Sequence, residues 1–358
     1  MRRLSDIAPY LADPGAVPSS LPLHRVTVFL TYACNLACPY CKTIVRSDDD
    51  LRRFPQKADT FTYELFAEYL TGLEAVPVHV HFTGGEAALV AELPRMVRLA
   101  SDRGVRHLSI TSNGTVPLKT FEGLVAAGLS EIRISIDAHE ATLGAILTGR
   151  AHAWQRVVKT IDALAALRSG GNRVFLIANT VVNEMNRTHV VDIVRFLIDR
   201  GVDDIKLITV VDRKDSLGDF PGAVDLLRKI EAMLQQYPAD AFPLLRRKLQ
   251  TVFSSQAIGL DVVRAPRDSD WRCYVPMSER TVDARYYYPC SVYLREGGRP
   301  LGRIQEPQHV QREKTADFVQ NGRCLDDPIC RTYCLHCTKI FNVAANEARE
   351  RANGGAPE

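Results

Sequence analysis

The sequence of 358 residues lacks a strong excess of charge of either sign, because 45 Lys and Arg are balanced by 42 Asp and Glu. It also lacks any run of about 18 consecutive apolar residues, the length of a membrane-spanning helix. The first 15 residues contain Asp6 and Asp13 among prolines, which is not the pattern of a secretory signal. These absences argue against nucleic-acid and membrane partners and predict a cytoplasmic location.

Cysteine is missing from residue 42 to residue 272, and all nine cysteines lie on either side of that interval. The first group has three members close together: Cys34, Cys38 and Cys41. The second group has six: Cys273, Cys290, Cys324, Cys330, Cys334 and Cys337. An odd total in a chain of this length does not fit a small disulfide scaffold. Clustering in a reducing compartment therefore indicates ligation of a metal or an iron–sulfur cluster.

Between the two cysteine groups, short apolar runs alternate with helical patterns. The six runs read as strands over residues 25–31, 78–83, 107–112, 131–137, 173–182 and 204–211. Thr62 is a predicted helix N-cap, and Gly104 and Gly128 stand where helices end. Alternation of this kind predicts a parallel sheet with right-handed crossovers. The predicted fold class is α/β, with six units forming a partial (β/α)6 TIM barrel.

The pattern changes near residue 220, which predicts a division of the chain. Residues 1–24 are a lead-in, 25–220 the partial barrel, and 221–350 two linker helices (222–236 and 240–254) followed by a small Cys-rich α+β domain. That domain is expected to hold a β-hairpin, a Cys-rich loop at 324–337 and a terminal helix near 338–350. The tail over 351–358 is expected to be disordered.

The first cysteine group follows the first predicted strand, at the edge of a barrel where ligands bind. Structural zinc takes four close ligands, and an iron–sulfur cube normally takes four thiolates. Three thiolates on one short loop leave the fourth iron of a [4Fe–4S] cube open to a small molecule. The spacing Cys-x3-Cys-x2-Cys, followed by the six-unit pattern, closely resembles the radical S-adenosylmethionine (radical SAM) superfamily.

This resemblance implies a [4Fe–4S] cluster bound by Cys34, Cys38 and Cys41, with S-adenosylmethionine (SAM) chelating the open iron. One electron then cleaves SAM, and the 5′-deoxyadenosyl radical abstracts a hydrogen from the substrate. Flavodoxin or ferredoxin is the expected type of reductant. The resemblance covers nearly the whole chain.

The same resemblance predicts further cofactor-binding residues at the ends of the strands. Tyr40 matches an aromatic residue that packs near the adenine, and Gly84-Gly85-Glu86 matches a segment in which Glu86 accepts from the SAM ammonium group. The remaining candidates are Asn113, Ser135, Asp137, Arg150 and Asn179. Arg150 departs in spacing from the arginine of some relatives. Of His79 and His81, which alternate along one strand, at least one is expected to be structural.

The second cysteine group resembles the SPASM/twitch extension, in which a hairpin and a Cys-rich loop hold auxiliary [4Fe–4S] clusters. Full SPASM domains usually have seven cysteines in this region, and Asn321 stands where the additional one is expected. Six thiolates cannot fully ligate two cubes, so one or two auxiliary clusters are possible.

Two ligand arrangements follow from this count. In a twitch-type arrangement one cluster is held by Cys273, Cys290, Cys334 and Cys337, and Cys324 and Cys330 are spare or catalytic. In the other arrangement two clusters share all six cysteines, with non-cysteine ligands such as Asp326, Asp327 or His336. A structural zinc in the Cys-rich loop is the alternative to both.

The expected enzyme is a radical SAM oxidoreductase of natural-product biosynthesis. An auxiliary cluster that accepts the second electron makes oxidation feasible, whereas a thiol donor such as Cys324 or Cys330 leads to epimerisation. About 24 residues precede the first strand, too few for a leader-binding domain, which favours a small polar substrate such as an amino sugar or aminocyclitol. Modification of a ribosomal precursor peptide remains the alternative. A non-catalytic zinc- or cluster-binding module is a remote third hypothesis.

Overall fold

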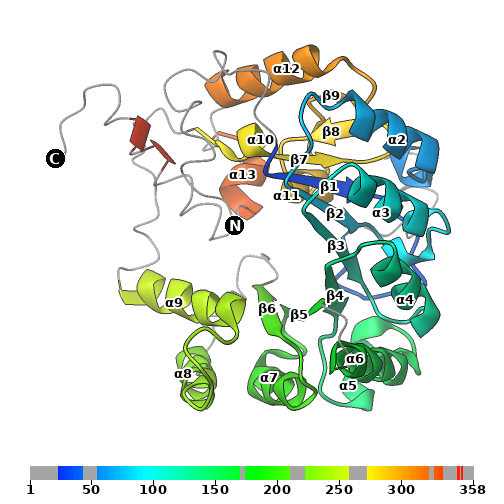
Figure 1. Ribbon diagram of the computed structural model, residues 1–358. Coiled ribbons are helices and arrows are strands. Elements are labelled where there is room, and N and C mark those ends of the chain that lie inside the picture. The colour runs from blue at the N-terminus through cyan, green and yellow to red at the C-terminus, as the bar shows by residue number, and fades with distance from the viewer. Residues whose placement is uncertain are drawn as a thin grey trace.

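The computed structural model describes residues 23–42, 55–169, 174–209, 222–257, 272–321, 326–333, 345–346 and 348–349 (Figure 1). Its strands form one nine-stranded sheet in the order β6-β5-β4-β3-β2-β1-β7-β8-β9. Their bounds are β1 Arg25–Phe29, β2 His79–Thr83, β3 His107–Ser112, β4 Glu131–Ser135, β5 Phe175–Val182, β6 Asp204–Thr209, β7 Glu279–Val282, β8 Tyr286–Tyr288 and β9 Gly302–Arg303. Neighbouring strands from β1 to β6 are all parallel.

Helices connect the strands and cover one face of the sheet (Figure 1). The α-helices of the first five units are α2 Tyr63–Gly72, α3 Leu93–Asp102, α4 Leu118–Ala126, α5 Ala141–Thr148, α6 Ala153–Ser169 and α7 Val190–Asp199, with both α5 and α6 in the fourth. Those that follow are α8 Ala223–Leu234, α9 Pro243–Ala257, α10 Val275–Ser278, α11 Ser291–Arg295, α12 Gln308–Asn321 and α13 Pro328–Tyr333. Short 3-10 helices are η3 Pro55–Ala58, η4 Ala87–Leu89 and η5 Arg187–His189.

Local sequence signals define the ends of several helices. The Thr62 hydroxyl accepts a hydrogen bond from the N–H of Leu65 at 3.3 Å, as expected for an N-cap. Gly104 and Gly128 follow α3 and α4 with φ of 86° and 113°, a backbone conformation that glycine adopts without strain.

Alternate residues of the strands face opposite sides of the sheet. The apolar positions, such as Val80, Ile110 and Ile134, pack with helix residues such as Phe66 and Phe121 in one core cluster. The opposite face, here called the inner face, has a different composition. Its strand positions include Thr27, His79, His81, Ser109, Thr111, Glu131, Arg133, Ser135, Asn179 and Lys206.

The predicted fold class is confirmed: six parallel β/α units form an open sheet that does not close into a barrel. Both predicted linker helices are present as α8 and α9. The C-terminal strands are less separate than the predicted division implies, because β7 pairs in parallel with β1 and extends the same sheet. The hairpin is formed by β7 and β8, paired antiparallel.

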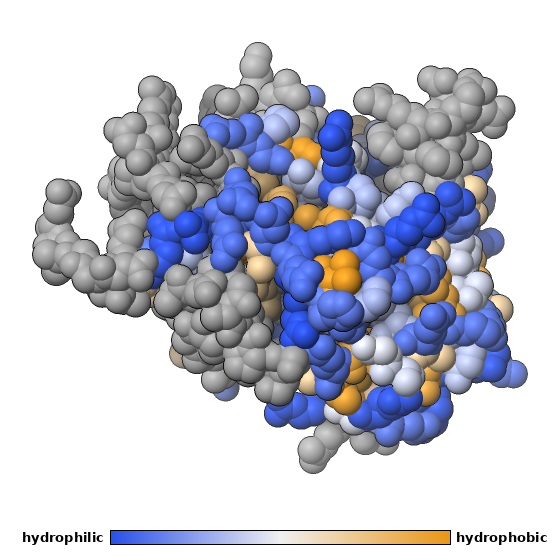
Figure 2. Space-filling view, turned by 90° about the horizontal axis from the view of Figure 1, so that it is seen from above, coloured by the Kyte–Doolittle hydropathy of each residue, from blue (hydrophilic) through white to orange (hydrophobic). Residues whose placement is uncertain are grey.

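Helices α5 and α12 were not predicted from the sequence. The lead-in up to residue 22, the tail over 351–358 and most of the predicted terminal helix lie outside the described residues. Within the part that the structure describes, no helix combines the length and apolar character needed to cross a membrane. On the face in Figure 2, coloured hydrophobic residues form small groups among hydrophilic ones.

Candidate functional site

The first cysteine group lies on the loop that follows β1, at the carboxyl end of the parallel strands. All three cysteines are half-buried and are not disulfide-bonded. Backbone hydrogen bonds attach this loop to the segment that follows β2. The N–H of Gly85 donates to the carbonyl of Thr31 at 2.6 Å, and the N–H of Glu86 donates to that of Ala33 at 2.8 Å. The loop is therefore anchored by its neighbour before any ligand is bound.

Gly84 and Gly85 permit this close contact between the two loops. A Cβ built at Gly84 would lie 2.5 Å from the carbonyl oxygen of Thr31, and one at Gly85 would lie 2.3 Å from that of Ala33. No other residue fits without moving the backbone. The sequence pointed to approach of a ligand, whereas the structure shows approach of the cysteine loop itself.

Glu86 joins this segment to the loop after β3. Its side chain is fully buried, and its two oxygens accept from the N–H of Ala88 at 2.9 Å and the N–H of Asn113 at 2.5 Å. Burial raises the pKa of the carboxyl, and the hydrogen bonds from Asn113, Ser112 and Ala88 oppose that rise. The role that the geometry shows for Glu86 is to hold two loops together.

The side chain of Asn113 extends this network to the cysteine loop. Its amide nitrogen donates to the Asn35 side-chain oxygen at 2.8 Å and lies 3.7 Å from the sulfur of Cys34. Its amide oxygen accepts from the N–H of Thr115 at 3.0 Å and the Thr115 hydroxyl at 2.6 Å. Asn113 is thus an orienting residue for Cys34, a role that its place in an Asn-Gly turn does not reveal.

Asp137 and Tyr40 meet on the other side of the loop. The Tyr40 hydroxyl donates to one oxygen of Asp137, and the N–H of Val181 donates to the other at 2.6 Å. Burial raises the pKa of Asp137 to about 6 despite these hydrogen bonds. The Tyr40 ring packs beside the small cluster of Ala138, Leu143 and Leu147. The carboxylate therefore links the cysteine loop to the ends of β4 and β5.

The end of α5 also contacts the cysteine loop, which the sequence did not indicate. The N–H of Ala37 donates to the carbonyl of Thr148 at 2.9 Å. Gly149 ends the helix with φ of 65°, and a Cβ there would meet the Ala37 carbonyl oxygen at 2.7 Å. The exposed Arg150 donates to the carbonyl of Asn35 at 3.4 Å. Arg150 thus reaches the loop despite its unusual spacing.

Ser135 and Asn179 are paired residues of β4 and β5 on the inner face. Ser135 is half-buried. The side-chain oxygen of Asn179 is buried and has no hydrogen-bond partner among the described residues. An unpartnered buried amide oxygen is costly, and it suits a donor on a bound molecule.

The electrostatics of the cysteines suit an iron–sulfur cluster. Burial is the main cause that raises the pKa of Cys34 and, to about 12, that of Cys38, and Glu86 and Asp137 add to these shifts. Thiolates at these positions need a cation to balance them, which a cluster provides. Three cysteines without a disulfide bond on one anchored loop, with the Asn179 oxygen that lacks a hydrogen-bond partner among the described residues on the neighbouring inner face, fit a cluster with one open coordination position.

Deeper on the inner face, His79 and His81 share one hydroxyl. Ser109 Oγ lies 2.6 Å from Nε2 of His79 and 2.7 Å from Nδ1 of His81, and the Thr111 hydroxyl lies 3.1 Å from Nε2 of His81. Burial lowers the pKa of both imidazoles, with Arg25 a further cause, so both are neutral. Both histidines therefore belong to a buried polar network.

The network continues with charged groups on β4. Arg133 donates to Glu131 at 2.5 Å, and the Nε2 of His107 lies 3.2 Å from the other Glu131 oxygen. Burial raises the pKa of Glu131, but the hydrogen bond from His107 and the charge of Arg133 outweigh it and lower the pKa to about 2. The inner face thus carries ionised and neutral polar groups below the cysteine loop.

The second cysteine group is described for three of its members: Cys273, Cys290 and Cys330. Cys290 caps α11, where its sulfur accepts from the N–H of Tyr293 at 3.4 Å. Burial raises the pKa of Cys290 to about 12, and the neighbouring thiols of Cys273 and Cys330 add to the rise. The three cysteines come from different segments of the chain, and the charges of two of them act on the third. Cys324, Cys334, Cys337 and His336 lie outside the described residues.

The Asp327 carboxylate has a structural role near these thiols. One oxygen accepts from the N–H groups of Ile329 and Cys330 at 2.8 and 2.9 Å, and the other accepts from the Tyr293 hydroxyl at 2.8 Å. Asp327 thus caps α13 and attaches it to α11. These three hydrogen bonds involve both oxygens, and the ligand role of Asp327 stays a prediction.

Two contacts join the cysteine loop to the C-terminal segment. Asp283 Oδ2 accepts from the Tyr32 hydroxyl at 2.9 Å and the Tyr288 hydroxyl at 3.0 Å, in a buried position. At the surface, Lys42 forms an ion pair with Glu296 at 3.1 Å. Sequence reasoning missed Asp283, although its place before a run of three tyrosines at the hairpin was a usable signal.

Comparison with known proteins gives one family and a set of relatives. The model of the Radical SAM superfamily matches residues 28–197. GTP 3′,8-cyclase 2 of Mycobacterium tuberculosis (strain ATCC 25618 / H37Rv) is 29% identical over 201 residues, which are 53% of this chain and 54% of the relative. GTP 3′,8-cyclase of Xanthomonas campestris pv. campestris (strain 8004) is 29% identical over 243 residues, 64% of this chain and 69% of the relative. The chain spans about half the length of the first of these curated relatives.

Two solved structures share the fold. Streptococcus suis SuiB bound to S-adenosylmethionine has a TM-score of 0.56 and 14% identity, covering 92% of this chain and 73% of SuiB. Native anSMEcpe with bound AdoMet has a TM-score of 0.57 and 15% identity, covering 92% of this chain and 97% of the other. At these identities the likeness concerns the fold alone.

Proposed function

We propose that this chain, whose residues 28–197 form a radical SAM domain, abstracts a hydrogen atom from a small polar substrate and carries out its oxidation or epimerisation. The radical SAM domain itself implies a [4Fe–4S] cluster that binds SAM. When bound, the cluster supplies the electron that cleaves SAM to methionine and a 5′-deoxyadenosyl radical. The proposal concerns what the residues of this chain do around that chemistry.

Cys34, Cys38 and Cys41 are the proposed ligands of this cluster. Asn113 orients Cys34 through its amide nitrogen, 3.7 Å from the sulfur. Asp137 and Tyr40 hold the other side of the loop. The unpartnered Asn179 oxygen is a proposed acceptor for a hydroxyl or amino group of SAM, and Ser135, its strand neighbour, is a second proposed contact.

The observation that carries the substrate class is the inner face of the sheet. Most of its side chains from β1 to β6 are hydroxyl, imidazole, amide, carboxylate or cationic groups, such as Thr27 and Lys206. Apolar positions on the same face include Phe29, Ile177, Val181 and Ile208. The imidazoles of His79 and His81 already have partners on the sheet, whereas the Asn179 oxygen has none among the described residues. A ligand rich in hydroxyl or amino groups supplies the partner that a buried polar group of this kind needs. The names of the cyclase relatives, which state GTP as their substrate, also support a polar small molecule.

The Cys-rich C-terminal segment is proposed to hold at least one auxiliary cluster that accepts the second electron of an oxidation. The thiols of Cys273 and Cys330 both raise the pKa of Cys290, and the hydrogen bond between Tyr293 and Asp327 attaches α13, which carries Cys330, to α11. These observations favour Cys330 as a ligand over a spare thiol. If Cys330 is a ligand, Cys324 is the remaining candidate for a catalytic hydrogen donor in an epimerisation. Flavodoxin or ferredoxin is the proposed type of reductant.

A peptide substrate is the second candidate, because the fold likeness includes SuiB bound to the precursor peptide SuiA and anSMEcpe with the bound Cp18Cys peptide. In this case the peptide backbone would contact the same polar inner face. The two candidates differ in which molecule donates the abstracted hydrogen.

The test is deuterium transfer into 5′-deoxyadenosine by the anaerobically reconstituted, reduced protein. Deuterated aminocyclitols, amino sugars and nucleotides form one panel, and deuterated precursor peptides form the other. His81→Asn is expected to lower transfer while SAM cleavage without substrate persists, and exposed Glu122→Gln serves as control. Transfer from peptides alone contradicts the substrate class, and absence of SAM cleavage contradicts the whole proposal.

A further inference from the structure

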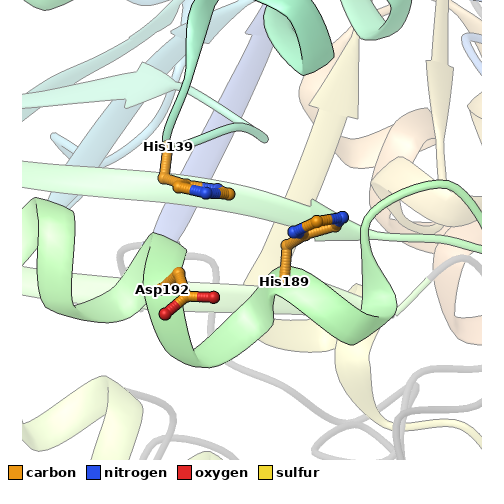
Figure 3. A group of neighbouring side chains, drawn as sticks. All are labelled: His139, His189 and Asp192. Atoms are coloured by element: carbon orange, nitrogen blue, oxygen red, sulfur yellow. The ribbon is translucent and has the colours of Figure 1, made fainter.

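Three metal-ligating side chains converge outside the cysteine groups, on the segments that follow β4 and β5. His139 lies on the loop between β4 and α5, His189 ends η5, and Asp192 lies in the first turn of α7. Figure 3 shows the two imidazole rings and the carboxylate directed into the same space. One ligand atom from each residue lies within 4.8 Å of the other two.

The spacing of these residues explains the convergence. His189 and Asp192 are three residues apart at the start of a helix, so their side chains leave on the same side. The His139 ring faces the His189 ring with centroids 5.3 Å apart and an angle of 30° between the planes. Metal–nitrogen bonds to zinc are about 2.0–2.1 Å, so two ligand atoms on one ion lie roughly 3.3 Å apart. Small side-chain rotations bring the three atoms to that separation.

A second observation points to a ligand at this position. The Nδ1 atom of His139 is buried and has no hydrogen-bond partner among the described residues. An imidazole nitrogen in that state is costly, and a metal ion is one of its usual partners. The Nδ1 atom of His139 is therefore available to bind a metal ion.

The ion pair that Arg195 forms with Asp192 is a weak one. Arg195 lies 3.3 Å from one oxygen of Asp192, and both side chains are at least half exposed. An exposed ion pair of this kind contributes about 0–1 kcal/mol, and it leaves the second carboxylate oxygen available.

We propose that His139, His189 and Asp192 form a binding site for one divalent transition-metal ion of the zinc type. Two imidazoles and one carboxylate suit zinc in the borderline-soft range, and their N and O donors distinguish this site from the thiolate sites. Water fills the remaining coordination position.

The ion would stabilise the two segments that lie at the edge of the proposed SAM site. His139 is two residues from Asp137, whose carbonyl accepts from the Asn186 side chain at 2.9 Å, and Asn186 also donates to the carbonyl of Val181 at 2.9 Å. These hydrogen bonds already join the β4 loop to the segment before α7. A metal ion shared by His139 and His189 adds a second link between the same segments, so its role is to stabilise and position.

The test uses cobalt(II) as a spectroscopic probe on the holoprotein with its iron–sulfur clusters reconstituted, so that the cysteines are occupied. One cobalt per chain is expected, with d–d absorption bands but no thiolate-to-cobalt charge-transfer band, and zinc displaces it. His189→Ala and Asp192→Asn weaken binding by more than about tenfold, since even the loss of outer-shell partners has that effect. Exposed His152→Ala is the matched control.

Thermal unfolding provides an independent readout. Zinc raises the Tm of the wild type and of His152→Ala, because a ligand that binds the native state stabilises it, and it leaves that of His189→Ala unchanged. His189→Ala is used first because His139→Ala also disturbs the loop that carries Asp137. Equal cobalt affinity in His189→Ala and His152→Ala, or no cobalt binding by the wild type, overturns the proposal.

Discussion

The two cysteine groups are constructed in different ways. Cys34, Cys38 and Cys41 lie on one loop, which backbone hydrogen bonds attach to the segment after β2. Cys273, Cys290 and Cys330 come from three segments, and side-chain contacts such as Tyr293 to Asp327 attach α11 to α13. The cysteines of the first group are positioned by one loop at the end of one strand, whereas those of the second group are positioned by packing between separate segments.

This difference determines what each group shows in the sequence. A ligand set on one loop has fixed spacing, because consecutive residues cannot move far apart. A set assembled from distant segments allows several pairings, as the two open arrangements of the second group illustrate. The ligand set of the first group can therefore be predicted from a short stretch of sequence, and that of the second group cannot.

Removal of one ligand from the first group is expected to have the largest effect. Cys38→Ala leaves two thiolates on the loop, so about four iron atoms per chain are lost and 5′-deoxyadenosine falls to the level of a protein-free control. Iron analysis and mass spectrometry of reduced samples measure both. Cys290→Ala, the comparison variant from the second group, retains SAM cleavage. Cleavage by Cys38→Ala at the wild-type rate would contradict the assignment.

The second group is tested by comparing Cys330→Ala with Cys290→Ala. Because Cys330 acts on the pKa of Cys290 and α13 is attached to α11, both variants are expected to lose the same iron and sulfide while SAM cleavage continues without product. Electron paramagnetic resonance of the reduced proteins records the loss of the auxiliary signal. Full iron content with lost product in Cys330→Ala would instead identify a catalytic thiol and restore the twitch-type arrangement.

The sequence predicted the strands well because their apolar runs reflect burial against helices. All six overlap the observed ones, from β1 to β6. It also located the residues around the cysteine loop, but not what they contact. In the structure Gly84 packs against Thr31, and Glu86 accepts hydrogen bonds from backbone N–H groups. A sequence motif indicates that a residue is near a site, but it does not indicate which atoms the side chain faces.

Other features depend on contacts that no local pattern encodes. Asp283 accepts hydrogen bonds from Tyr288 and from Tyr32, which is 251 residues earlier in the sequence. Strand β7 also pairs with β1, although the two are far apart in the chain. The end of α5 contacts Ala37 through a backbone carbonyl, which any residue type provides. Long-range pairings of this kind become visible only in three dimensions.

The next largest effect is expected from substitution of Glu86, the buried carboxylate that joins the loops beside the first cysteine group. Glu86→Gln replaces one accepting oxygen by an amide N–H₂ group that faces a backbone N–H, so the free energy of unfolding falls by about 1–3 kcal/mol. Urea denaturation measures the change, with exposed Glu122→Gln as the control. SAM cleavage falls as the Asn113 loop loosens. Stability equal to that of the control would show that Glu86 does not join the loops.

The smallest effect concerns the ion pair between the two regions, Lys42 and Glu296. The side chains are 34% and 15% exposed, so solvent screening limits the coupling to about 0.2–1 kcal/mol. A double-mutant cycle with Lys42→Met and Glu296→Gln isolates this term in urea denaturation, and added salt reduces it. Coupling well above that range would mean that the cysteine loop depends on the C-terminal segment for its position, in which case the two regions form one unit. Coupling within it leaves the pairing of β7 with β1 and the buried Asp283 contact as the main links between them.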